Sequence, residues 1–192
     1  MKMDRNETIP VYSGRPQKEE DEKKRRVYDA LDALSIPYLR AEHDAAHTIE
    51  DCAEIENALG APVCKNLLLC NRQKTAFYLL IMPGDKPFKT KDVTAQIQSA
   101  RLSFAGPEDM ERLIGCRPGS ASLLGLMFDK DHNVSLLIDE ELLKKEYWCF
   151  HPCCNTATLK LEQKALLEKF LSMCGHAPRI VKLPRYENEE GV

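Results

Sequence analysis

Cysteine and histidine, side chains that bind zinc or exchange disulfides, cluster in the last quarter of the chain. The stretch 148–159 reads W-C-F-H-P-C-C-N-T-A-T-L and places three cysteines and a histidine within six residues. In an extended strand, Cys149, His151 and Cys153 would share one face. A structural zinc site, however, usually takes four ligands as two close pairs, and the chain contains no C-x-x-C pair. We therefore predict no metal ion; a small zinc or thiol-redox protein is the alternative.

Pro152 suggests a different role for His151. The residue before a proline is held extended, so the imidazole should point in a fixed direction from the end of a strand. Asn155 and Thr156 follow with an amide and a hydroxyl, groups that hydrogen-bond small polar ligands. A binding pocket and a structural histidine would account for His151 about equally well.

A lysine interrupts the apolar strand pattern V-C-K-N-L-L-L-C at residues 63–70. The ammonium group of Lys65 in a partly apolar cleft would suit an ester carbonyl, a phosphate or a ribose hydroxyl. A strand-end lysine that reaches water is the alternative. Asn66 would point to the opposite face, so only one of the two side chains can face a given pocket without a bulge.

The segment 115–125, G-C-R-P-G-S-A-S-L-L-G, is a candidate ligand-binding loop. Glycine allows backbone N–H groups to approach a ligand closely, and Gly119 is followed by the hydroxyls of Ser120 and Ser122. The Gly-Lys-Ser/Thr ending of a phosphate-binding P-loop is absent. An ordinary turn is the alternative interpretation.

Length and composition indicate one soluble globular domain. The chain has 192 residues, 43% apolar and 30% charged. We expect a loose arm at 1–17, a single domain at 18–185 and a polar tail at 186–192. The net charge of −3 excludes a globally basic surface, so any RNA contact would be local and confined to the reactive end.

Neither a membrane-spanning run of about 20 apolar residues nor the apolar region of a signal peptide is present. We therefore expect a cytoplasmic protein with no membrane contact. In that compartment the eight cysteines would be reduced thiols.

Hydrophobic periodicity predicts a mixed sheet surrounded by helices, α+β in class. Apolar runs at 63–70 and 75–82 predict a buried hairpin, and V-S-L-L-I-D predicts another strand after the L-L-G-L-M-F run and a turn. Thr48 is a candidate N-cap. Helices are expected over 18–34, where the first half of the helix would be solvated, and around 52–59, 93–97, 107–114 and 166–174. Further strands are expected at 36–43, 147–151, 156–161 and 179–183.

Taken in order, these stretches resemble the YbaK/ProX family, which includes the editing domain inserted in bacterial prolyl-tRNA synthetases. The resemblance runs from about Val27 to Leu183 and includes E-H-D-A-A-H-T-I-E-D, C-K-N-L-L-L, G-C-R-P-G-S-A-S-L-L-G-L, F-H-P-C-C-N-T-A-T-L and G-H-A-P-R-I-V-K-L. It implies a mixed, strongly curved sheet and no cofactor. One departure is that the family often has proline where this chain has Leu123.

The resemblance also implies a function and a site. The chain is most similar to the free-standing ProX branch, which hydrolyses alanyl-tRNA(Pro), so the implied partners are mischarged tRNA(Pro) and prolyl-tRNA synthetase. A cysteinyl-tRNA(Pro) deacylase and a non-catalytic tRNA-binding module are the alternatives. The residues assigned to catalysis are Lys65, Gly119, Ser120 and His151, and those assigned to substrate binding are Thr48, Asn66, Ser122, Asn155 and Thr156.

Overall fold

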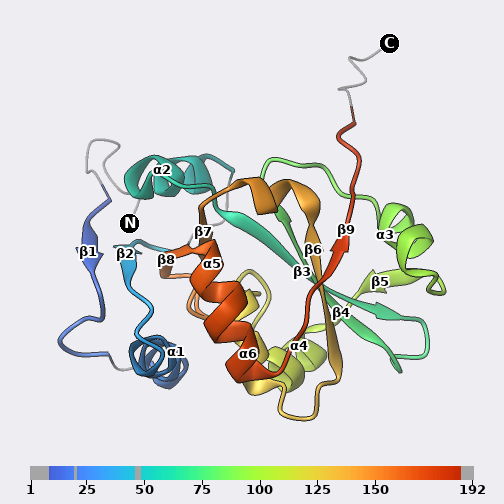
Figure 1. Ribbon diagram of the computed structural model, residues 1–192, viewed down its shortest axis with the longest axis horizontal. Helices are drawn as coiled ribbons and strands as arrows, with labels where there is room; N and C mark the ends of the chain where they lie inside the picture. The colour runs from blue at the N-terminus through green and yellow to red at the C-terminus, as the bar shows by residue number, and fades with distance from the viewer. Residues whose placement is uncertain (1–8, 20, 46–48, 187–192) are drawn as a thin grey trace.

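The computed structural model describes residues 9–19, 21–45 and 49–186, and arranges them as two β-sheets with helices around them (Figure 1). One sheet is antiparallel, with the order β1 (Val11–Ser13), β2 (Tyr38–Glu42), β8 (Ala157–Glu162), β7 (Tyr147–Phe150). The other is mixed, with the order β5 (Leu102–Phe104), β3 (Cys64–Asn71), β4 (Phe77–Pro83), β6 (Val134–Asp139), β9 (Arg179–Val181).

The predicted α+β class is confirmed, although the strands form two sheets instead of one. Strand β3 pairs antiparallel with β4 and β5, as the hairpin prediction required, whereas β4–β6 and β6–β9 are parallel. A parallel bridge between Val63 and Cys149 connects the start of β3 to β7 of the other sheet. This bridge brings the ends of the lysine-bearing strand and the histidine-bearing strand together.

Helices cover both sheets. The segment from Gln163 to Cys174 is continuous but contains a π-helical stretch, and it lies across the front of the molecule in Figure 1. None of the described helices is long and apolar enough to cross a membrane. The bounds are α1 (Glu22–Ala33), α2 (Ile49–Leu59), α3 (Thr90–Ile97), α4 (Pro107–Ile114), α5 (Gln163–Ala165), η3 (Leu166–Phe170) and α6 (Leu171–Cys174), with 3₁₀ helices η1 (Leu123–Phe128) and η2 (Glu140–Lys144).

The alternating side chains of β3 divide the core into two parts. Cys64, Leu68 and Cys70 pack into the larger cluster, which also contains Trp148 and Phe150 of β7. Leu67 and Leu69 point to the other face, where they meet a second cluster that includes Val93 and Ile97 of α3. Each face of this sheet is therefore closed by a different set of helices.

Val11–Ser13, within the predicted loose arm, forms an edge strand paired with β2, so the arm is not loose over these residues. The apolar run Leu123–Phe128 is a 3₁₀ helix. Ser122 is its N-cap, and the Ser122 hydroxyl accepts a hydrogen bond from Leu124 N. Thr48 lies outside the described residues.

Candidate functional site

The loop before η1 contains a tight turn built by Pro118 and Gly119. Ser120 N donates to Arg117 O at 2.9 Å, which closes a four-residue turn. Gly119 has a φ of 83°, the left-handed value that the third position of a type II turn requires, and proline suits the second position. The sequence P-G therefore gives this loop one defined shape.

Both loop hydroxyls stabilise the loop itself. Ser120 is buried; its Oγ accepts from Arg117 N at 3.0 Å and donates to Arg117 O at 2.9 Å. Ser122 is also buried and caps η1 through Leu124 N. Because the Ser120 hydroxyl is already bonded twice, the geometry supports a structural hydroxyl more than a nucleophile.

Asn66 connects strand β3 to the same loop. Its Oδ1 accepts from Leu123 N at 2.9 Å, and its Nδ2 donates to Cys64 O at 2.8 Å. A proline at position 123 could not donate the first of these bonds. The departure of this chain from the family pattern therefore provides a donor that fixes the Asn66 side chain.

The turn after β7 faces the Pro118–Gly119 turn. A Cβ added at Gly119 would lie 3.7 Å from Asn155 Nδ2, so the two loops are in contact there. Cys116 and Cys153 are both buried, and the neighbouring Cys116 thiol, together with burial, raises the pKa of Cys153. The structure thus brings Gly119, Asn155 and, through Leu123, Asn66 into one region.

His151 lies at the end of β7 as a neutral imidazole with a defined tautomer. Its Nδ1 is 2.9 Å from Ala157 O, and because a carbonyl only accepts, Nδ1 carries the hydrogen and Nε2 is left as an acceptor. Burial lowers the pKa of His151, and the nearby His43 lowers it further, whereas the bond to Ala157 O opposes the shift.

Two partners of His151 were not predicted from the sequence. Thr158 Oγ1 lies 3.2 Å from His151 Nδ1 and 2.9 Å from His43 Nε2, and the two imidazole rings are 5.9 Å apart. His43 belongs to the family-like stretch E-H-D, but only the spatial pairing of β2 with β8 places it beside Thr158. The neighbouring Thr156 contacts Cys154 Sγ through its hydroxyl at 3.5 Å.

Cys153 does not continue the strand face of Cys149 and His151. Strand β7 ends at Phe150, and Cys153 has a φ of 60°, so the extended geometry that would align Cys149, His151 and Cys153 is lost after Pro152. Cys149 packs in a small cluster under α2, while Cys153 joins the main core. Among the described residues, no three His, Cys, Asp or Glu side chains are grouped closely enough to hold a metal ion.

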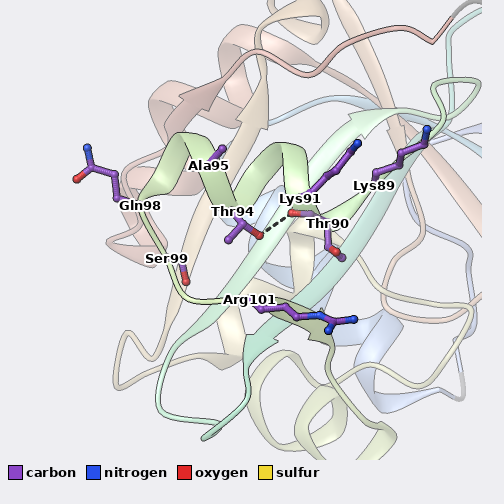
Figure 2. Close-up of a pocket in the computed structure, with 8 residues that line it drawn as sticks. All are labelled: Lys89, Thr90, Lys91, Thr94, Ala95, Gln98, Ser99 and Arg101. Atoms are coloured by element: carbon purple, nitrogen blue, oxygen red, sulfur yellow. Dashed lines mark hydrogen bonds between the residues drawn. The ribbon is translucent and has the colours of Figure 1, made fainter.

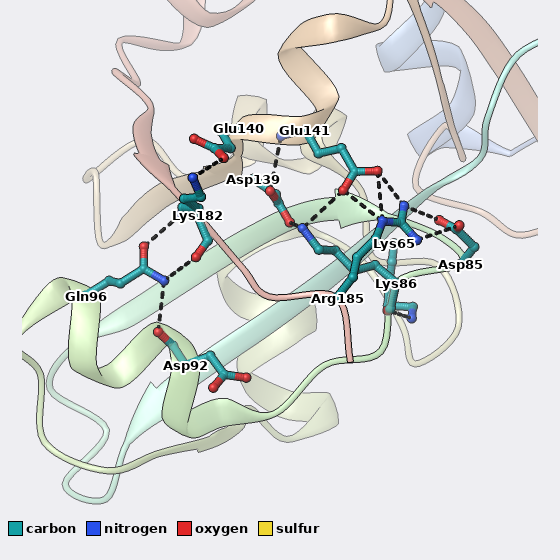
Figure 3. A network of polar contacts seen from close by, with 10 residues as sticks. All are labelled: Lys65, Asp85, Lys86, Asp92, Gln96, Asp139, Glu140, Glu141, Lys182 and Arg185. Carbon is teal, nitrogen blue, oxygen red and sulfur yellow. Dashed lines mark hydrogen bonds and ion pairs between the residues drawn. The ribbon is translucent and has the colours of Figure 1, made fainter. Parts of the chain in front are cut away.

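Lys65 points to the other face of β3 from Asn66, as the alternation predicted. Lys65 is paired across the hairpin with Met82, which belongs to the α3 side of the core. Its Nζ donates to Lys86 O at 2.8 Å, beside the ion-pair network of Asp85 and Arg185 (Figure 3). Partial burial lowers the pKa of Lys65. The ammonium group of Lys65 therefore contacts the segment after β4 and lies on the opposite face of β3 from Asn66.

Comparison with known proteins identifies the class. The family model for the aminoacyl-tRNA editing domain matches residues 43–169, and the chain belongs to this family. The match begins at His43, directly after β2, and includes the Lys65 strand, the Gly119 turn and the His151 turn, so the described site lies wholly within it. The class defined by fold and site is therefore that of an aminoacyl-tRNA editing enzyme.

The chain is also similar to two curated proteins and to one solved structure. The prolyl-tRNA editing protein ProX of Acetoanaerobium sticklandii is 29% identical over 160 residues, covering 83% of this chain and 97% of its own. Prolyl-tRNA synthetase associated domain-containing protein 1 of Mus musculus is 30% identical and covers 79% of this chain and 90% of its own. A crystal structure of a candidate trans-editing enzyme for prolyl-tRNA synthetase shares the fold, with a TM-score of 0.64 at 20% identity over 86% of this chain.

Proposed function

We propose that the chain hydrolyses the ester between a wrongly attached amino acid, most favourably alanine, and the 3′ end of tRNA(Pro). The observation that carries the proposal is the contact between the Pro118–Gly119 turn and the Asn155 turn, with a neutral His151 at the end of the adjoining strand. The similarity to proteins named for prolyl-tRNA editing supports tRNA(Pro) as the substrate.

The backbone of Gly119 supplies the donor for the ester carbonyl. Ser120 N is already bonded to Arg117 O, whereas Gly119 N has no acceptor within the part of the chain that the structure describes. An N–H group held in advance by a tight turn stabilises the oxyanion that develops during attack without reorganising. The mechanism therefore uses Gly119 N as the oxyanion donor, and assigns Ser120 to shaping the turn.

His151 and Asn155 form the amino-acid side of the site. With Nδ1 bonded to Ala157 O, the Nε2 lone pair of His151 can accept a proton from water or hold the substrate amine. An aminoacyl ester is already activated, so positioning and oxyanion stabilisation suffice without a covalent intermediate. A pocket closed around a methyl group would exclude the ring of proline and so spare the correctly charged tRNA.

Lys65 is assigned to the terminal nucleotide instead of the ester. It lies on the opposite face of β3 from Asn66 and the Gly119 loop, and its ammonium group keeps donors free besides the bond to Lys86 O. Phosphate or ribose hydroxyl groups suit a partly buried ammonium.

The decisive experiment is a deacylation panel over alanyl-, cysteinyl-, seryl- and prolyl-tRNA(Pro). We expect alanyl-tRNA(Pro) to react fastest and prolyl-tRNA(Pro) to be spared. Faster cysteinyl-tRNA(Pro) would change the assigned amino acid, and binding without release of any amino acid would leave only a tRNA-binding module.

Lys65→Ala tests the nucleotide assignment. We expect it to lower kcat/KM by at least tenfold, about 1.4 kcal/mol of binding in the transition state. Lys160→Ala is the matched control, because Lys160 is also a strand lysine whose Nζ donates to a backbone carbonyl, Leu59 O at 2.9 Å. Wild-type activity in Lys65→Ala would remove Lys65 from the mechanism.

A further inference from the structure

A basic hollow lies beside α3 and the segment that leads from this helix to β5, apart from the loops that form the candidate site. Its volume is about 890 Å³, and the side chains around it come from α3 and the loops that flank the helix (Figure 2). The lining contains three cations, three hydroxyls and an amide, and no carboxylate. The residues are Lys89, Thr90, Lys91, Thr94, Ala95, Gln98, Ser99 and Arg101, which we call the α3 surface.

The cations of the α3 surface are not neutralised by the protein. Lys91 and Arg101 are exposed and form no ion pair within the described ranges. Lys89 Nζ lies 3.7 Å from the centre of the Tyr186 ring, a contact that leaves its positive charge uncompensated. The acidic residue of this helix, Asp92, accepts from Tyr186 OH at 2.6 Å and does not line the hollow. The α3 surface is therefore a locally positive region in a chain whose net charge is −3.

An exposed aromatic ring lies next to these charges. Phe104 of β5 is 61% exposed and packs edge-on against Phe88 at 6.1 Å between ring centres. Exposed aromatic rings beside cations are the combination with which proteins bind single-stranded nucleic acid, since bases stack on the ring while the cations follow the phosphates. Both features lie on the same face of the sheet, because Leu102 and Phe104 are two residues apart and Leu102 packs with α3.

The same face leads to Lys65. Phe104 is paired with Leu69, and Lys65 is four residues before Leu69 on the same side of β3, about 13 Å along the strand at about 3.3 Å per residue. A strand of RNA that crosses the α3 surface and Phe104 would therefore continue toward the lysine assigned to the terminal nucleotide.

We propose that the α3 surface and Phe104 bind the RNA of the substrate, with Lys91 and Arg101 contacting phosphates and Phe104 stacking on a base near the 3′ end. The choice of tRNA as this RNA rests on the proposed function. A small phosphate ligand fits less well, because the cations are spread over exposed side chains around an open hollow and do not converge in a closed pocket.

Binding is measured first, with uncharged tRNA(Pro), so that catalysis is not required. Lys91→Gln/Arg101→Gln should weaken binding by at least tenfold near 0.15 M salt. The slope of log K against log salt should fall in magnitude by about 1.4 to 1.8, because each phosphate contact contributes about 0.7 to 0.9. Lys130→Gln/Lys164→Gln removes two exposed cations elsewhere and is the matched control. Phe104→Ala should weaken binding about tenfold and leave the salt slope unchanged.

Two outcomes would overturn the proposal. The first is equal binding by Lys91→Gln/Arg101→Gln and wild type, and the second is an equal loss in the Lys130→Gln/Lys164→Gln control, which would indicate only a non-specific effect of net charge. Circular dichroism of each variant shows whether it is folded, and the exposed position of all four cations makes misfolding a small concern.

A comparison of two substrates separates this inference from the proposed function. Full-length alanyl-tRNA(Pro) should lose kcat/KM in Lys91→Gln/Arg101→Gln, whereas a short alanylated 3′ oligonucleotide, too short to reach α3, should react at the wild-type rate. If the wild-type chain deacylates neither substrate but its tRNA binding depends on Lys91 and Arg101, the proposed function fails and the surface stands. If Lys91→Gln/Arg101→Gln deacylates both substrates at the wild-type rate, the proposed RNA-binding role of the α3 surface is wrong and the proposed deacylase function is retained.

Discussion

His151 combines a fixed tautomer with a lowered pKa, and these two properties determine how it responds to pH. Its Nδ1 hydrogen is committed to Ala157 O, and Thr158 and His43 extend the contact into a short polar chain. Burial lowers the pKa of His151 below the usual value of 6.5. The neutral form with a free Nε2 lone pair therefore persists to more acidic pH than it would for an exposed histidine.

The pH profile of deacylation tests this assignment. We expect kcat/KM, corrected for spontaneous ester hydrolysis, to lose activity on the acidic side with an apparent pKa below 6.5. His151→Gln should abolish that acidic limb, whereas His132→Gln, a change of an exposed histidine, should keep it. An apparent pKa above 6.5 for the loss of activity on the acidic side, or an acidic limb that persists in His151→Gln, would contradict the role of His151.

The same shift affects stability. Because the folded-state pKa is lowered, the unfolded chain binds more protons between the two pKa values, so stability is full above pH 6.5 and decreases as the pH falls toward the folded-state value. The limit for one histidine is about 1.4 kcal/mol per pH unit. His176, whose pKa burial also lowers, contributes with the same sign.

Asn66 is the residue through which β3 holds the Gly119 loop. Asn66→Ala leaves the buried N–H of Leu123 without an acceptor, and we expect a loss of about 1–3 kcal/mol in the free energy of unfolding together with lower deacylation activity. Leu123→Pro removes the donor instead, at a first helical position where proline is tolerated, and should free the Asn66 side chain; because Leu123 is fully buried in the core, this variant also loses packing. Urea unfolding and kcat/KM measure both effects.

Asn71→Ala is the matched control for this prediction. Asn71 also makes side-chain hydrogen bonds, to Thr75 and Ala76 in the β3–β4 turn, but it lies at the opposite end of β3. It should cost stability and leave deacylation unchanged. Equal loss of activity in both asparagine variants would show that the Asn66 effect is only destabilisation.

Among the elements, the Pro118–Gly119 turn is the one whose backbone conformation bears directly on the site. Gly119→Ala forces a β-carbon into the left-handed region, which costs about 1–2 kcal/mol, and points it toward Asn155. We expect this variant to lose both stability and activity. Gly14→Ala is a close control, since Gly14 has a φ of 70° and a β-carbon there would meet no atom within 4 Å. If both alanine variants keep full activity, the turn does not position the oxyanion donor.

Local pattern predicted the elements better than it predicted their contacts. The β3–β4 hairpin and the opposite directions of Lys65 and Asn66 followed from alternation alone, because strand periodicity is a local property. The run Leu123–Phe128 adopts a 3₁₀ helix since Ser122 caps it and Gly125 packs against Ile114 O, where a β-carbon would be only 2.5 Å away. That constraint comes from α4 and is invisible in the run itself.

The candidate site residues were chosen one by one from the sequence, but their contacts in the fold depend on distant strand pairing. Nothing near His151 in the sequence indicates His43, which reaches it only because β2 pairs with β8. Similarly, the contact of Gly119 with Asn155 joins two loops that follow different sheets. An extended strand would have placed Cys153 on the same face as Cys149 and His151. Pro152 and the positive φ of Cys153 end the extended geometry before that position.

At the scale of the whole molecule, a buried ion pair joins the segment after β4 to the end of β6, and a network of charges around it includes Arg185 of the C-terminal segment. Lys86 Nζ lies 2.7 Å from Asp139 Oδ2, with both side chains almost fully buried, and Glu141 is 3.3 Å from the same ammonium (Figure 3). Arg185 pairs in turn with Asp85 and Glu141 and, together with Lys86, lowers the pKa of Glu141 to about 2. The backbone carbonyl of Lys86 also accepts a hydrogen bond from the ammonium group of Lys65.

Breaking the Lys86–Asp139 ion pair should strongly lower the free energy of unfolding. Lys86→Met leaves Asp139 buried and unpaired, and we expect a loss of about 3–5 kcal/mol in urea unfolding. The double variant Lys86→Met/Asp139→Leu should be much more stable than the sum of the single losses predicts. Arg15→Gln, which breaks an exposed pair with Asp29, should cost no more than about 1 kcal/mol. Additive losses at Lys86 and Asp139 would refute the coupling.

The central place of β8 in the antiparallel sheet has a consequence for the order in which the chain can fold. Tyr38 of β2 pairs with Leu161 of β8, about 120 residues later, so this sheet cannot close until most of the chain has left the ribosome. Pairing across such a long loop carries a large closure entropy and slows folding. During synthesis β2 can pair with β1, but the side of β2 that meets β8 stays unpaired, and the histidine pair of the site is assembled only in that late step.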